Sequence, residues 1–126
     1  MGVDENKAVV SRYLAGMHAR PPDLTVFDEL LAANFQGDRA ARKARASALD
    51  SATHEQVLEV VDLVAEGDVV VARFNYQVTV PNGTMTKARG YALYRLDGGK
   101  IVSHDVVTDP DLTPVLAPLV SAPASD

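Results

Sequence analysis

The hydrophobic pattern of the chain changes its period near residue 56, and this change separates a helical part from a sheet part. Beyond it, apolar and polar residues alternate and β-branched residues become common, which is typical of strands. The pattern predicts four of them: Gln56–Ala65, Val69–Val80, Thr84–Leu96 and Ile101–Thr108. Each connection contains a glycine, as tight hairpins require, so we expect an antiparallel meander.

Before residue 56, apolar residues recur every three or four positions, which predicts amphipathic helices. The predicted helices are Asp4–Ala19, Thr25–Ala33 and Arg39–Ala52. Helices that precede a meander predict an α+β fold, in which three helices pack on one face of a curved antiparallel sheet.

Within Val69–Val80, the face that carries Phe74 and Tyr76 should meet the helices. The opposite face is polar and partly hydrophobic, and we expect it to be a homodimer surface. Three prolines interrupt the tail, residues 111–126, and Pro110 precedes it; Leu112 and Leu116 of the tail are expected to pack across a pocket mouth. We expect the last six residues, SAPASD, to be disordered.

Composition narrows the classes of protein. The 126 residues predict one domain, and a net charge of −5 argues against a nucleic-acid partner. No apolar run approaches the roughly 18 residues of a membrane span, and the start, MGVDENK, is too polar for a signal peptide, so a cytoplasmic protein is expected. There is no cysteine and the three histidines are widely spaced, so we expect no metal.

Four stretches, ENKAVVSRYLAG, FDELLAANF, VVDLVAEGDVVVARF and ALYRLDGGKIVSHDVVTDP, resemble the SnoaL-like family of the NTF2-like superfamily. The resemblance covers residues 1–110 and implies a cone-shaped domain without a cofactor. Similar proteins include polyketide cyclases, ketosteroid-type isomerases, small epoxide hydrolases and polyether ring-forming enzymes, with acid–base carboxylates inside the cone. The same cone also serves as a pure binding module.

His104 and Asp105 are neighbours on the last strand, so a regular strand points them to opposite faces. Relatives carry His-x-Asp here, but Val106 stands at the position of that carboxylate. A regular ladder turns His104 and Val106 inward, whereas a bulge or an inverted phase turns Asp105 into the pocket. A carboxylate frequent in relatives is also replaced, by Ala92.

Asp38 precedes the third helix, where relatives often carry a pocket-lining carboxylate. It can also cap that helix, and a helix N-terminus stabilises the anion, which suits a base or an electrostatic anchor. The helix carries four cations, which form either a solvated face or a basic rim for an acidic partner or a carboxylate-bearing substrate.

We predict a cyclase that closes a polyketide-type substrate by acid–base catalysis, with Asp38 and Asp105 as the pair and His104 supporting or replacing one of them. Closure at oxygen, giving a pyran or furan, and closure at carbon both stay open. The alternatives are a non-catalytic binding module and a small epoxide hydrolase. The expected substrate contacts are Tyr76, Tyr94, Phe74, Asp62 and Phe35.

Overall fold

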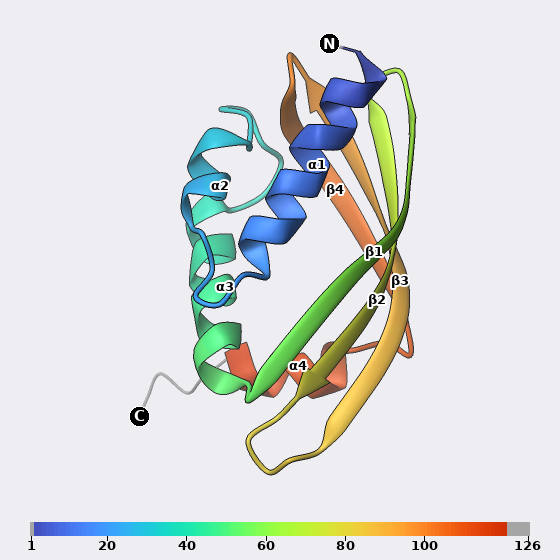
Figure 1. Cartoon of the computed structure of the whole chain (residues 1–126). Coiled ribbons are helices and arrows are strands. Elements are labelled where there is room, and N and C mark those ends of the chain that lie inside the picture. Colours follow the sequence, from blue (N-terminus) through green and yellow to red (C-terminus); the bar gives the residue numbers. More distant parts are fainter. Residues whose placement is uncertain (1, 121–126) are drawn as a thin grey trace.

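Four strands form one antiparallel sheet in the order β1-β2-β3-β4, and helices cover one of its faces (Figure 1). The computed structural model describes residues 2–120. Its elements are α1 (Val3–Met17), α2 (Thr25–Glu29), α3 (Arg39–Ala52), β1 (Glu55–Glu66), β2 (Val69–Thr79), β3 (Met85–Asp97), β4 (Lys100–Asp109) and α4 (Thr113–Val120). The predicted α+β class and the meander are confirmed, and the predicted bounds of α3 match the observed ones.

The core lies between α1 and the inner face of the sheet. Every second residue of β2, including Phe74 and Tyr76, is buried there, as the alternation predicts. Tyr13 of α1 is fully buried and places its ring edge-on to Tyr94 of β3 and to Phe27 of α2. These aromatic contacts join both layers of the domain.

The segment after α2 runs beside β4 and replaces the end of the predicted second helix. Leu31 forms a parallel bridge with Ile101, and the Ala32 amide donates to the Ile101 carbonyl at 2.8 Å. The helix predicted to reach Ala33 therefore stops at Glu29, because the next backbone groups bond to a strand. This pairing fixes where α3 begins.

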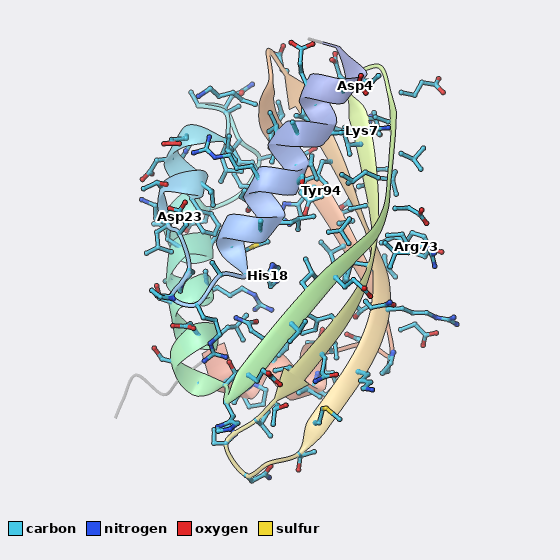
Figure 2. All side chains as sticks on the ribbon, viewed as in Figure 1. Asp4, Lys7, His18, Asp23, Arg73 and Tyr94 are labelled. Carbon is cyan, nitrogen blue, oxygen red and sulfur yellow. The ribbon has the colours of Figure 1, made fainter. Side chains whose placement is uncertain are left out.

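A β-bulge at Val61 reverses the inward and outward alternation of β1. Before the bulge, Leu58 and Val60 are partly buried and pack against the core; after it, Leu63 takes the inner face. Asp62 was expected to contact the substrate, but after the bulge it lies on the outer face. Its side chain is 56% exposed and pairs with Arg73 at 2.9 Å. Arg73 lies on the face of the sheet that points away from the helices (Figure 2).

Gly90 lies on the inner face of β3, where two neighbours leave no room for a side chain. A Cβ atom there would lie 2.5 Å from the Val107 carbonyl oxygen and 2.7 Å from Cζ of Phe74. Glycine at this position lets the Phe74 ring pack directly on the backbone of the adjacent strand.

The short helix α4 packs against α3 near the open end of the sheet (Figure 1). Leu112 and Leu116 are buried, consistent with the apolar contacts expected of the tail. The disorder expected for SAPASD lies outside the described residues. Within residues 2–120, no helix is both long and apolar enough to cross a membrane.

Substitution of Arg39 tests how much its hydrogen bonds at the start of α3 stabilise the protein. Its guanidinium donates to the carbonyls of Phe27 at 2.6 Å and Ala32 at 2.8 Å. We expect Arg39→Gln to lower the free energy of unfolding in urea by about 1–3 kcal/mol, because half-buried carbonyls lose charged donors. The control, Lys43→Gln, breaks an exposed pair with Asp28 and should cost about 0–1 kcal/mol. Equal losses in both variants would contradict this anchoring role.

Candidate functional site

A cavity of about 580 Å³ lies between the inner face of the sheet and helices α1, α3 and α4. Apolar side chains form most of its wall, among them Leu49, Leu58, Phe74 and Leu116. Its polar wall comes from three sources: α1 and the residue that caps it provide Tyr13 and His18, α3 provides arginines, and the strands provide Gln56, Tyr76, Tyr94, His104 and Thr108. A largely apolar cavity with a few convergent polar groups is typical of a small-molecule site.

β4 places His104 in the cavity and Asp105 outside it. The pairing of β3 with β4 is regular from Arg89 to Arg95, so the strand keeps one phase across this stretch. His104 and Val106 therefore line the cavity, while Asp105 is exposed on the outer face. Of the two alternatives that the sequence left open, the regular ladder is the observed one.

His104 is neutral near neutral pH. Burial is the main cause that lowers its pKa, to about 4; the nearby Arg42 charge lowers it further, while Asp105 acts in the opposite direction. Its ring stacks on Phe35 at 6.2 Å and lies 5.7 Å from the ring of Tyr94. Its Nδ1 atom is buried and has no hydrogen-bond partner among the described residues.

Two buried tyrosines extend this cluster toward α1. Burial raises the pKa of Tyr94 well above its usual value, and the adjacent Tyr13 raises it further. Burial also raises the pKa of Tyr13, whose hydroxyl has no partner within residues 2–120. Both phenols therefore stay protonated and can donate to an oxygen atom of a ligand.

Tyr76, Gln56 and His18 of the wall already have hydrogen-bond partners within the protein. The Tyr76 hydroxyl donates to Oε1 of Gln56 at 2.7 Å, and burial raises the pKa of Tyr76 to about 12. His18 Nδ1 lies 3.0 Å from the Leu14 carbonyl, so this nitrogen carries the proton and Nε2 is an acceptor. Burial lowers the pKa of His18. Tyr76 can therefore accept a hydrogen bond from a substrate, but its proton is already used.

Asp38 caps α3, as predicted, and lies at the edge of the cavity. Its carboxylate accepts from the Ala41 amide at 3.0 Å, and its side chain is exposed. Among the described residues that line the cavity, no other residue carries a carboxylate. The structure therefore does not bring Asp38 and Asp105 together, and the predicted pair across the cone is wrong.

The predicted substrate contacts are partly in place. Tyr76, Tyr94 and Phe74 line the cavity, Asp62 faces away from it, and Phe35 stacks behind His104. Sequence reasoning did not assign Arg42, Tyr13 or Gln56 to the site. Helical spacing was a usable signal for the first, because Arg42, Arg45 and Leu49 recur on one stripe of α3 and all three line the cavity.

Within the described residues, no group of three or more His, Asp or Glu side chains is arranged to hold a metal ion. The polar groups of the cavity are instead hydrogen-bond donors and acceptors suited to an organic ligand.

The family model described as SnoaL-like domain matches residues 10–104. Solved structures with the same fold include a candidate SnoaL-like polyketide cyclase from Jannaschia sp. CCS1, at 20% identity and a TM-score of 0.72, covering 96% of this chain and 94% of that one. TsrD from Streptomyces laurentii has 15% identity and a TM-score of 0.75, and the match covers 97% of this chain and 98% of TsrD. AclR, a candidate hydroxylase from Streptomyces galilaeus, has 21% identity and a TM-score of 0.74, and the match covers 97% of this chain and 100% of AclR.

A search of curated proteins gave no match. An NTF2-like protein from Burkholderia pseudomallei also shares the fold, at 18% identity and a TM-score of 0.70, covering 97% of this chain and 100% of that one. At these identities the structural likeness establishes the fold, and the resemblance noted in the sequence is confirmed.

Burial of His104 predicts a pH-dependent stability. Its folded pKa of about 4 lies below the ordinary 6.5, so the unfolded chain binds more protons between these values and the native state loses stability as pH falls through that window. We expect the free energy of unfolding in urea to decrease from about pH 7 to about pH 5, and less so in His104→Gln.

Two measurements check this prediction. His54→Gln changes an exposed histidine and should keep the pH dependence of the parent protein. An NMR titration of the His104 ring should give a midpoint near 4. A midpoint at the ordinary histidine value would show that the ring is not desolvated in this way.

Proposed function

Because the chain belongs to the SnoaL-like family, we propose that it is a cofactor-free cyclase or isomerase that acts on a polyketide-type molecule. The observation that carries the proposal is His104, a neutral imidazole with an unpaired Nδ1 atom in a largely apolar cavity. A neutral imidazole can accept a proton from an acidic carbon and return it in a later step. In this proposal His104 carries out the acid–base catalysis for which the sequence predicted Asp38 and Asp105 as the pair.

In the proposed reaction, His104 removes a proton from the carbon between two carbonyl groups of the substrate. The electron pair of that C–H bond moves to a carbonyl oxygen, which accepts a hydrogen bond from the Tyr94 hydroxyl. The enolate carbon then attacks a second carbonyl of the same molecule, and the imidazolium returns its proton to the new alkoxide. Atoms balance without another reactant.

The low pKa of His104 makes proton abstraction harder and proton return easier. A weakly basic imidazole abstracts a proton only when the developing oxyanion is well stabilised, whereas its imidazolium is a strong acid that returns the proton readily. The cavity wall contributes by holding a flexible chain in the conformation that closes. If a hydroxyl replaced the acidic carbon, the same base would support closure at oxygen, to a pyran or furan.

A ligand-binding role without chemistry is the second candidate. It is favoured by the apolar residues Ala92 and Val106 in the cavity and by the lack of a converging carboxylate pair among the described residues. An epoxide hydrolase is less well supported, because Asp38 alone would have to position and activate a water molecule from the cavity edge.

Proton abstraction can be tested with β-diketones and β-keto esters that carry a pendant ketone. In D₂O, NMR should detect protein-dependent exchange of the acidic C–H and then ring closure. We expect His104→Gln to slow both by about 10²–10⁴-fold. Asp105→Asn alters an exposed carboxylate on the other face and should stay near the parent rate. An unchanged rate in His104→Gln excludes this base, and binding without exchange in the parent protein favours the second candidate.

We also propose that the outer face of the sheet pairs two copies of the chain. Tyr91 of β3 and Val107 of β4 are register partners on this face and are 55% and 67% exposed. Val64 is exposed on the same face, and Asp62, Arg73 and Asp105 place charges of both signs around this apolar strip. A surface with both signs of charge around an apolar centre can face itself across a two-fold axis.

Light scattering after gel filtration tests the pairing. We expect a dimer for the parent protein and a monomer for Tyr91→Lys, because the substitution places a charge at the centre of the strip. Val3→Lys alters an exposed apolar residue of α1 and should leave the dimer intact. A parent protein that stays monomeric at high concentration contradicts the proposal.

A further inference from the structure

Arg42 is a cation of α3 that, like Arg45, has no carboxylate partner among residues 2–120. Of its neighbours on the helix, Arg39 binds backbone carbonyls and Lys43 pairs with Asp28 at 2.8 Å. Arg42 lines the cavity and lies over the Phe35 ring at 5.4 Å. Across residues 2–120, no carboxylate lies within ion-pair distance of its guanidinium.

Three buried polar atoms in the same cavity wall have no protein partner in the described part of the chain. They are Nε of Arg42, the hydroxyl of Tyr13 and Nδ1 of His104. They come from α3, α1 and β4, which are distant in sequence. Leaving such groups unpaired is costly. Arg42 Nε and the Tyr13 hydroxyl are donors, so these two groups indicate a ligand that supplies oxygen atoms.

The charges in the cavity agree with this interpretation. Arg42 and Arg45 both line it, whereas Asp38 is at the edge with its carboxylate committed to the cap of α3. The Arg42 charge also lowers the pKa values of Tyr13 and His104, which places all three groups within one electrostatic neighbourhood. An arginine fork matches the planar geometry of a carboxylate and can bind it through two parallel hydrogen bonds.

We propose that this cavity recognises its substrate through a free carboxylate, which Arg42 binds and to which Tyr13 donates its hydroxyl proton. The carbon skeleton then lies against the apolar wall formed by Leu58, Phe74 and Leu116. This inference deepens the proposed function and rests on it. It specifies a polyketide-type acid and selects against the corresponding neutral ester or amide.

Two probes of similar shape, one with a carboxylate and one neutral, test whether Arg42 binds the carboxylate, which is called the carboxylate anchor. The probes are 2-naphthoate and 2-naphthamide, and isothermal titration calorimetry measures their binding to the full chain. We expect the parent protein to bind naphthoate at least about tenfold more tightly than naphthamide. In Arg42→Gln this preference should fall to about twofold or less, with naphthamide affinity unchanged.

Lys43→Gln is the matched control, because it removes the same charge from the same helix but outside the cavity wall. It should keep the preference of the parent protein. If Arg42→Gln does not fold, as judged by circular dichroism, Arg42→Lys replaces it. That variant should retain part of the preference, because lysine keeps the charge and loses the fork.

A parent protein that binds both probes equally overturns the carboxylate anchor, and so does an unchanged preference in Arg42→Gln. These outcomes are separate from the exchange assay. Exchange without a preference for naphthoate refutes the anchor alone, whereas a preference for naphthoate without exchange refutes the cyclase alone.

Discussion

The position of the site depends on the backbone hydrogen bonds that join the segment after α2 to β4. Ile101 donates to the Leu30 carbonyl at 2.8 Å, and Gln36 donates to the Val102 carbonyl at 2.7 Å. Lys100 and Arg39 add side-chain bonds to carbonyls of the same region. Because this segment leads directly into α3, these bonds determine where Arg42 lies relative to His104. A shift of one residue in the pairing would turn α3 and carry its cations away from the cavity.

The periodicity of the sequence was sufficient for the architecture, because burial imposes the strand alternation and the helical stripe directly on composition. The periodicity was not sufficient to predict which face of the sheet each carboxylate takes. The inward or outward direction of Asp62 is reversed by a single extra residue at Val61, and nothing in the local composition marks that bulge. The side that Asp105 takes followed from a register that only tertiary pairing defines.

The sequence did not indicate that Arg42 lines the cavity, for a different reason. In the sequence it is one of four cations on an alanine-rich helix, and such helices are usually solvated. Tyr13 and His104, which the Arg42 charge influences, are 29 and 62 positions away in the sequence and come near Arg42 only through packing. The result is a cavity whose helical wall is positive and whose sheet wall is neutral. A carboxylate paired with Arg42 would offset one of the two causes that lower the pKa of His104, so an acidic ligand would make the imidazole more basic.

Gly90 shows how the room available to a ligand can be separated from the polar groups that act on it. The Phe74 ring forms part of the cavity wall, and it packs against the space where a side chain at position 90 would lie. Even one added methyl group would clash with the Val107 carbonyl oxygen of β4 and would push the Phe74 ring toward the cavity. The room in the cavity therefore depends on a residue of a neighbouring strand, separately from the histidine, tyrosine and arginine side chains of the wall.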